Sequence, residues 1–367
     1  MNIGIITFHR ADNFGAALQC FALQFFLQQQ GHKVKVLDYR CKAIEQVYYL
    51  FDIRLLFARK NIFKTLNTYL FNILNYGEMY RKRSAYKRFR SEFLSLSKPL
   101  RSEFKEECGI DAYIAGSDQI WNFSLLHGYN KMYFLDFPTV SQSLKISYAA
   151  SSESSAFPEL ERFKKNISLA LNRFDSISVR ETELKEELQK YTSKEISVCI
   201  DPTFLLEKNE YEKILVTPKE RGYILVYHMA ETLDAVDLAN HIAKEKGLDV
   251  IEIHASFKSK KGLRHKRDLG PLQILGYIKY ADAVITNSFH GVSLSLILNK
   301  ELWVINKYKS ARLQTLLSIS GLTNRYIKNI GEYHNSTIDY TLVKSNMEKI
   351  IQDSQKFLIQ SLSNRKK

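Results

Sequence analysis

The chain has 367 residues, 45% of them hydrophobic, and its 53 lysines and arginines against 39 acidic residues give a formal net charge of +14. The hydrophobic content excludes a disordered protein, and the length exceeds what one ordinary core accommodates, so we expect two domains. No uninterrupted apolar segment approaches the roughly 20 residues that span a bilayer, and residues 1–6 resemble a strand rather than a signal peptide, so we expect a cytoplasmic protein. The positive charge favours anionic partners, among which nucleic acid is not expected because no nucleic-acid-binding motif accompanies it.

The cysteines carry no metal or disulfide pattern. Cys20, Cys41, Cys108 and Cys199 are scattered, with no Cys-x-x-Cys pair and no histidine nearby. We therefore expect neither a bound metal nor a disulfide framework, and we interpret these residues as buried thiols.

Strand-like apolar runs alternate with helix-length segments along nearly the whole chain. Residues 2–8, 14–30 and 33–39 have the strand, helix and strand pattern of a βαβ unit, which predicts a parallel sheet. Further strands are predicted at residues 112–115, 145–150, 176–179, 197–200, 222–227, 248–254, 283–286 and 302–306. The predicted fold class is therefore α/β, with two Rossmann-like domains whose strand ends face a cleft.

The break at Asp201-Pro202-Thr203 separates two sets of strands. We place an N-terminal α/β domain at residues 1–205 and a C-terminal Rossmann-like domain at residues 206–335. Apolar positions at a helical period predict that residues 336–367 contain a terminal helix that packs back on the body.

A long aromatic and basic segment, residues 48–95, is predicted to be an amphipathic helical insertion in the first domain. In one interpretation its apolar face joins the core and its charges are solvated. In the other, it attaches the protein peripherally to an anionic membrane surface. A second basic run, residues 258–267, is predicted to lie in a loop after a strand, where it could rim the cleft.

Polar residues follow two strands of the first domain, at the sheet edge where ligands bind in α/β folds. Asn13-Phe14-Gly15 opens the first helix, where backbone N–H groups could approach a sugar or an anion; the alternative is a tight strand-to-helix turn. Ser117, Asp118 and Gln119 follow the strand at 112–115, and Asp118 could orient a hydroxyl of a ligand. The alternative is an Asx-type cap with Trp121 in the core.

Arg180 lies at the end of the strand predicted at residues 176–179. Its guanidinium could bind a carboxylate or phosphate in a bidentate manner, and an ion pair with Glu181 or another acid is the alternative.

Ser288-Phe289-His290-Gly291 follows the apolar run at residues 282–286, where a buried strand turns into a helix. Ser288 is a natural N-cap, so the first-turn N–H groups and the positive end of the helix dipole would face whatever binds beside His290. A phosphorylated or carboxylated substrate suits this place; the alternative is a core histidine at a capped helix start. Lys307, Lys309 and Arg312 follow the next strand and would gather positive charge near His290.

Taken together, these motifs resemble the polysaccharide pyruvyl transferase family over most of the chain. The resemblance rests on Asn13-Phe14-Gly15 with Leu18-Gln19, Ile114 to Asn122, Ser147 to Ser151, Ser178 to Glu181, Asp201-Pro202-Thr203, and Gly270-Pro271 through Ala281-Asp282 to Gly291. It implies a glycosyltransferase-B-like pair of domains that transfers an enolpyruvyl unit from phosphoenolpyruvate to two hydroxyls of one sugar as a ketal. The family releases phosphate in this reaction and uses neither a metal nor another cofactor.

The resemblance also implies roles for individual residues. The general acid of the family corresponds to His290 and its donor-binding arginine to Arg180, while its donor-binding lysine corresponds to Lys307, with Lys309 close by. The remaining expected donor ligands are Ser288 and Arg312. The expected acceptor ligands, in the first domain, are Asn13, Gly15, Ser117, Asp118 and Gln119.

The implied acceptor is a sugar, free or lipid-linked, in the synthesis of a bacterial cell-surface polysaccharide. Two alternatives stay open: a nucleotide-sugar glycosyltransferase of the same architecture, and a non-catalytic glycan-binding protein of an envelope pathway. The identity of the donor separates the first alternative from pyruvyl transfer, and phosphate release excludes the second.

Overall fold

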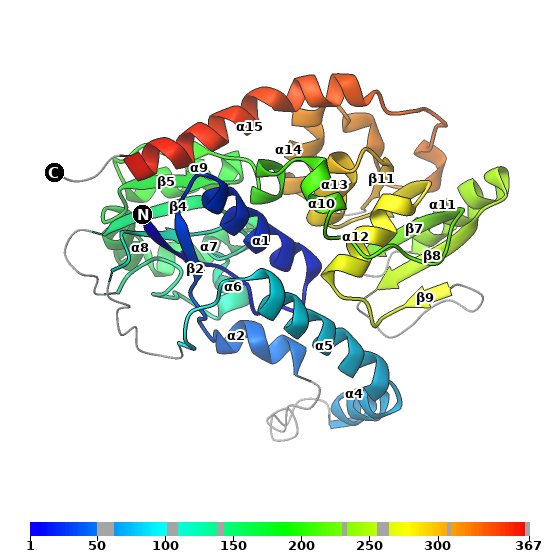
Figure 1. Cartoon of the computed structure of the whole chain (residues 1–367), viewed down its shortest axis with the longest axis horizontal. Helices are drawn as coiled ribbons and strands as arrows, with labels where there is room; N and C mark the ends of the chain where they lie inside the picture. The colour runs from blue at the N-terminus through cyan, green and yellow to red at the C-terminus, as the bar shows by residue number, and fades with distance from the viewer. Residues whose placement is uncertain are drawn as a thin grey trace. The chain divides into compact units, whose positions relative to one another are not determined.

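The computed structural model describes residues 1–49, 62–100, 109–137, 143–229, 233–254, 264–306 and 310–363. By its internal contacts the chain divides into two compact units (Figure 1). The first unit comprises Met1–Glu45, Arg90–Glu207 and Lys344–Lys367, and the second comprises Gln46–Phe89 and Lys208–Val343.

A six-stranded parallel sheet in the order β2-β1-β3-β4-β5-β6 forms the centre of the first unit. Its strands are β1 (Asn2–Ile6), β2 (Lys33–Val36), β3 (Ala112–Ala115), β4 (Leu144–Ala150), β5 (Ser176–Val179) and β6 (Ile196–Val198). Every residue of β3 and β4 is buried. Burial of both faces is typical of a parallel sheet covered by helices, and it explains why β3 appears in the sequence as a continuous apolar run.

The second unit contains another six-stranded parallel sheet, in the order β12-β11-β10-β7-β8-β9. Its strands are β7 (Tyr223–His228), β8 (Asp249–His254), β9 (Arg264–Lys266), β10 (Ala283–Thr286), β11 (Glu301–Ile305) and β12 (Tyr326–Ile327). The α/β class with two Rossmann-like domains is thereby confirmed. A cleft between the two units stays a prediction.

Helices connect the strands of both sheets. They are α1 (Phe14–Gln29), α2 (Lys42–Glu45), α4 (Ile62–Leu74), α5 (Tyr76–Phe93), α6 (Phe123–Leu126), α7 (Phe157–Arg162), α8 (Lys164–Leu171), α9 (Thr182–Leu188), α10 (Lys208–Glu212), α11 (Leu233–Lys246), α12 (Pro271–Tyr280), α13 (Phe289–Ile297), α14 (Ala311–Ser320) and α15 (Tyr340–Ser363). Short 3₁₀ turns η1 to η6 span Gln46–Tyr48, Ser154–Ala156, Gln189–Tyr191, Pro202–Leu205, Thr323–Arg325 and Ile330–Glu332.

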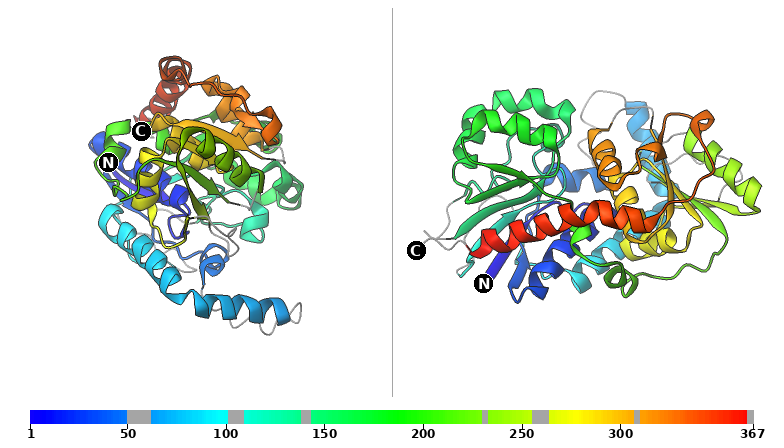
Figure 2. Two further views of the ribbon diagram at one scale, coloured as in Figure 1. Left: turned by 90° about the vertical axis from the view of Figure 1, so that its right-hand side faces the viewer. Right: turned by 90° about the horizontal axis from the view of Figure 1, so that it is seen from above.

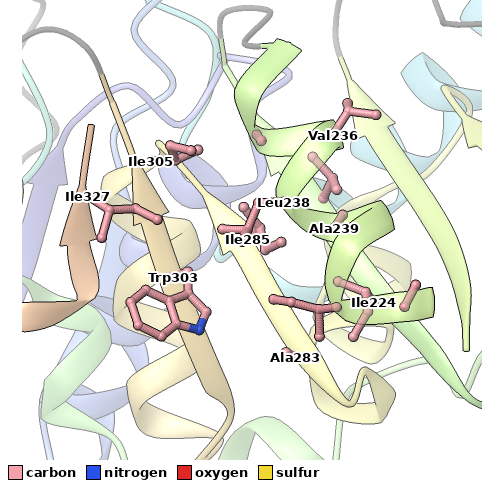
Figure 3. Close-up of a cluster of buried hydrophobic side chains, with 13 residues drawn as sticks. Ile224, Val236, Leu238, Ala239, Ala283, Ile285, Trp303, Ile305 and Ile327 are labelled. Carbon is pink, nitrogen blue, oxygen red and sulfur yellow. The ribbon is translucent and has the colours of Figure 1, made fainter. Parts of the chain in front are cut away.

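One core of the second unit lies between its sheet and α11 (Figure 3). Alternate residues of the strands contribute to it, such as Ile224 and Val226 of β7, because successive side chains of a strand point to opposite faces. Val236 and Ala239, three positions apart on α11, supply the helical side of the same core. This packing holds the sheet rigidly and thereby positions its carboxyl edge.

The basic helical segment groups differently from the sequence-based expectation, whereas the terminal helix packs back on the body as expected. By its contacts Gln46–Phe89 groups with the second unit, whereas residues 48–95 are predicted in the first domain. Long-range contacts account for this grouping: Arg81 Nε donates to Asp268 at 2.8 Å, and the Arg267 guanidinium lies over the Phe71 ring. At the other end of the chain, α15 packs on the first unit, where Ser354 Oγ accepts a 2.9 Å bond from the Ile200 N–H.

The second basic run is only partly a loop, so that prediction is wrong for Arg264–Lys266. Arg264–Lys266 pair with β8 as the edge strand β9, and the lysines before residue 264 lie outside the described residues. The cations of this strand are paired within the unit, Lys266 with Glu220 and Arg264 with Asp249. Their place at a cleft rim stays a prediction.

Candidate functional site

Five polar residues of the first unit follow five neighbouring strands at the carboxyl edge of the sheet. Thr7 follows β1, Ser117 follows β3, Ser151 follows β4, Arg180 follows β5 and Asp201 follows β6. All five are buried. Because parallel strands end at the same edge, these side chains meet in one hydrogen-bonded network.

Arg180 occupies the centre of this network. Its guanidinium donates to Asp201 Oδ2 at 2.6 Å and to Glu181 Oε1 at 3.2 Å. Burial opposes its charge, but the carboxylates of Glu181 and Asp201 outweigh burial and raise the pKa of Arg180 above its ordinary value. Arg180 therefore forms the ion pairs that the alternative interpretation expects. A role in donor binding would be additional to these pairs.

Further bonds hold the two carboxylates in place. Ser151 Oγ donates to Glu181 at 2.6 Å, and both the N–H and the hydroxyl of Thr203 donate to Asp201 Oδ1. The Thr203 N–H bond caps the turn η4, which explains locally why Asp201-Pro202-Thr203 interrupts the strand pattern.

Ser117 is fully buried rather than open to a ligand. Its Oγ lies 3.0 Å from the Ala149 carbonyl and 3.2 Å from Asp201 Oδ2, and its carbonyl accepts from Thr7 Oγ1. The preceding residue must be glycine, because Gly116 has φ +144° and a Cβ there would lie 1.9 Å from the Tyr148 carbonyl oxygen. Ser117 thus joins neighbouring strands at their ends.

Asp118 and Gln119 are half-buried and lie on the same edge. Asp118 has φ +68°, and its Oδ1 accepts from the Gln119 N–H at 2.8 Å. The helix that follows, α6, is capped by Asn122 rather than by Asp118, since Asn122 Oδ1 accepts from the first-turn N–H groups. Trp121 lies in the core, as the alternative interpretation expects, and donates to the Tyr133 carbonyl.

Asn13 is the N-cap of α1. Its Oδ1 accepts from the N–H groups of Gly15 and Ala16 at 2.9 and 3.1 Å, and Gly15 is buried. This geometry supports the strand-to-helix turn that the sequence left open as the alternative.

In the second unit, His290 lies in the first turn of α13, directly after β10. Ser288 is the N-cap of α13, and its Oγ accepts from the Gly291 N–H at 3.3 Å. His290 is largely buried, and its ring meets the Phe289 ring edge to face at 5.3 Å. The cap, the first-turn N–H groups and the dipole of α13 make this end of the helix suitable for an anion.

Two contacts fix this turn against the sheet. A Cβ at Gly291 would lie 2.5 Å from Thr286 Oγ1, so only glycine permits α13 to start so close to β10. Asn287 Oδ1 accepts from the Met229 N–H at 2.8 Å, which ties the turn to the end of β7.

Of the cations predicted near His290, the structure describes one. Arg312 is half-buried in the first turn of α14, which follows β11, the strand next to β10. Because β10 and β11 are parallel, α13 and α14 begin at the same edge of the sheet. Lys307 and Lys309 lie outside the described residues.

A buried histidine cluster at the same edge escaped the sequence analysis. Glu252 accepts from His228 at 2.8 Å and from His265 at 3.0 Å, and the His254 ring lies 4.2 Å from that of His228. Burial would raise the pKa of Glu252, but the bonds from both histidines outweigh it and lower this pKa to about 2. A signal was present: Glu252 and His254 alternate with isoleucines, which places both on one face of a buried strand.

Three of the four cysteines, Cys20, Cys41 and Cys199, are buried free thiols, as predicted, and Cys108 lies outside the described residues. Within the described ranges, no group of His, Cys, Asp and Glu side chains is arranged to hold a metal ion. None of the described helices combines the length and the apolarity needed to cross a membrane.

Solved structures with a similar fold are sugar-modifying enzymes at low identity. The UDP-GlcNAc 2-epimerase from Neisseria meningitidis bound to UDP-GlcNAc is 9% identical, with a TM-score of 0.46, over 100% of this chain and 95% of that one. The UDP-GlcNAc 2-epimerase from Methanocaldococcus jannaschii is 10% identical, with a TM-score of 0.46, over 99% of each chain. The E. coli heptosyltransferase WaaC with ADP is 12% identical, with a TM-score of 0.37, over 95% of this chain and 100% of that one.

Among curated proteins, no sequence matches the chain. A family model does: the one described as polysaccharide pyruvyl transferase matches residues 13–306.

Proposed function

The chain belongs to the polysaccharide pyruvyl transferase family, and on this basis we propose that it transfers the enolpyruvyl group of phosphoenolpyruvate to two hydroxyls of one sugar. A proton adds to the methylene carbon of the donor, which makes the neighbouring C2 electrophilic. One sugar oxygen bonds to C2, the bond between C2 and the phosphate oxygen breaks, and the second sugar oxygen bonds to C2. Of the two protons that the sugar loses, one balances the proton on carbon and the other leaves with phosphate.

We assign the protonation of the methylene carbon to His290. Its position in the first turn of a capped helix is the observation that carries this proposal, because that turn suits the phosphate and carboxylate of the donor. Imidazolium is a usable acid near neutral pH, and a positioned general acid typically contributes about 10²- to 10⁴-fold in rate.

The remaining donor contacts are assigned to residues of both units. Ser288, which caps the first turn of α13, stays a proposed donor ligand, and Arg312, together with Lys307 and Lys309, neutralises the charges of the donor and of the departing phosphate. Arg180 stays a proposed donor ligand, with the requirement that its guanidinium bind the donor while it pairs with Asp201 and Glu181.

For the acceptor we propose a sugar of a cell-surface polysaccharide precursor, free or lipid-linked, modified in the cytoplasm. Asp118 and Gln119 are the half-buried candidates after β3 and are assigned to direct contact. Asn13, Gly15 and Ser117 shape the edge through the bonds described above. Peripheral membrane contact is a separate proposal, which rests on a different surface.

The test measures phosphate release from phosphoenolpyruvate with a panel of simple glycosides, next to assays with nucleotide sugars as donors. We expect acceptor-dependent release that falls at least about 10²-fold in His290→Ala. The matched control is His241→Ala, because His241 is an exposed histidine on α11 of the same unit. Donor binding, measured by calorimetry, should persist in His290→Ala.

Normal turnover in His290→Ala would refute the assignment of the acid. Consumption of a nucleotide sugar without use of phosphoenolpyruvate would replace the proposed reaction by glycosyl transfer. Inactivity with every donor and acceptor, with measurable glycan binding, would favour the non-catalytic alternative.

A further inference from the structure

The segment from Val47 to Tyr80 carries an unusual concentration of exposed apolar side chains. In the described part of the chain, eight of the fifteen exposed large hydrophobic residues lie in it: Val47, Tyr49, Leu66, Leu70, Ile73, Leu74, Tyr76 and Tyr80. We call these eight residues the apolar patch. Scattered exposed hydrophobic residues need no explanation, but a contiguous group marks a surface that binds something.

On α4 the exposed residues form one stripe. Leu66, Leu70, Ile73 and Leu74 follow the i, i+4, i+7, i+8 spacing of a single helical face, and they are 51 to 74% exposed. The opposite face packs inward, where Asn72 is buried and the Phe71 ring lies against the Arg267 guanidinium. The apolar stripe is therefore the outer face of a helix that already has its partner on the inner side.

The next helix, α5, also has an exposed row of residues, but of a different chemistry. A single residue, Asn75, separates α4 from α5, and the two helices are joined at an angle (Figure 2). Tyr76 and Tyr80 stack on its outer face with ring centroids 6.1 Å apart, and Arg83 and Lys87 continue the same i, i+4, i+7, i+11 row, both exposed. In chain order, the exposed residues are thus leucines and an isoleucine on α4, then tyrosines and then cations on α5.

The charge of this segment is strongly one-sided. Residues 62–90 contain seven lysines and arginines and one acidic residue, Glu78. Glu78 is half-buried and pairs with Arg267, so it does not neutralise the outer cations. Arg81 pairs with Asp268 and the buried Arg90 pairs with Asp12, whereas Arg83 and Lys87 are exposed cations outside these ion pairs. The exposed surface of this segment therefore combines apolar side chains with positive charge.

We propose that the apolar patch and the cations of α5 bind an anionic membrane surface, with α4 lying in the plane of the headgroups. Apolar residues on one face with tyrosines and cations beside them are the composition of an interfacial helix. α4 has 13 residues. At about 1.5 Å per residue it reaches roughly 20 Å, so it can lie on a bilayer but not cross one.

The experiment is flotation of the purified full chain with vesicles of phosphatidylglycerol and phosphatidylcholine, compared with vesicles of phosphatidylcholine alone. We expect binding to the anionic vesicles, weakened by salt. The double variant Leu70→Glu, Ile73→Glu should weaken the partition about tenfold or more. Lys87→Ala should weaken it roughly fivefold, on anionic vesicles only.

The control is the double variant Leu169→Glu, Leu342→Glu. These leucines are 53% and 57% exposed, against 57% and 60% for Leu70 and Ile73, so the change in surface polarity is matched and lies elsewhere on the chain. The control should bind vesicles like the unmodified chain, and the circular dichroism of all variants should be unchanged.

Failure to bind anionic vesicles, or equal binding by both double variants, overturns the proposal. A dimer that Leu70→Glu, Ile73→Glu dissociates in sedimentation, with vesicle binding unaffected, would instead assign the patch to a second copy of the chain. The partition is measured without donor or acceptor, so its outcome does not depend on the proposed pyruvyl transfer.

Discussion

Replacing Arg180 by alanine removes the only described cation that bonds both Asp201 and Glu181. The three side chains are 3%, 0% and 3% exposed, so the variant leaves two carboxylates buried without their cation. Removing one partner of such a buried group typically costs about 3–5 kcal/mol, a large share of the roughly 5–15 kcal/mol that stabilises a domain. At about 2–4 °C per kcal/mol for a domain of this size, we expect a loss of roughly 10 °C in Tm.

Thermal and urea unfolding of Arg180→Ala measure this loss. The control is Arg173→Ala, because Arg173 pairs with Asp136 in the same unit but its side chain is 55% exposed, so about 1 kcal/mol or less should be lost. The double variant Arg180→Met, Asp201→Asn should recover part of the stability, since it removes charge from both sides of the pair.

An Arg180→Ala protein that unfolds like the unmodified chain would refute this reasoning. If that stable variant also failed to bind phosphoenolpyruvate, the Arg180 guanidinium would bind the donor, and the stability of the fold would not depend on its pairing with Asp201 and Glu181. A large loss of stability with normal donor binding in the folded fraction would leave Arg180 as a positioning residue only.

Two further predictions concern both units. Because the pKa of Glu252 is lowered from 4.5 to about 2, its contribution to stability is present above about pH 4.5 and is lost as the pH falls towards 2. Glu252→Gln should therefore be less stable at pH 7 by up to roughly 3 kcal/mol, and urea titrations should show the gap close in acid; a constant gap would contradict the pairing. Gly116→Ala should cost about 3 kcal/mol or more, because its Cβ would overlap the Tyr148 carbonyl oxygen. Gly247→Ala, with φ +66° but nothing within 4 Å of the added Cβ, should cost about 1–2 kcal/mol, and equal losses for the two glycines would refute the close approach.

Much of both sheets follows from the sequence alone. The strands at residues 112–115, 176–179 and 283–286 are observed at the predicted residues, because a strand buried on both faces appears as a short apolar run between polar turns. The sequence does not predict β9, because Arg264–Lys266 has no apolar pattern. These residues form a strand only by pairing with β8 at the edge of the sheet.

For the site, the sequence determined which residues stand at strand ends and that Ser288 caps the helix of His290, since capping depends on neighbours in the chain. Tertiary structure alone decided what those residues touch. Arg180 meets Asp201, 21 positions away, because β5 and β6 lie side by side, and the outer face of α4 is exposed because α4 packs through its other face. Composition and local pattern set the elements and their caps, while the partner of a charge or of an apolar face depends on which strands and helices the fold brings together.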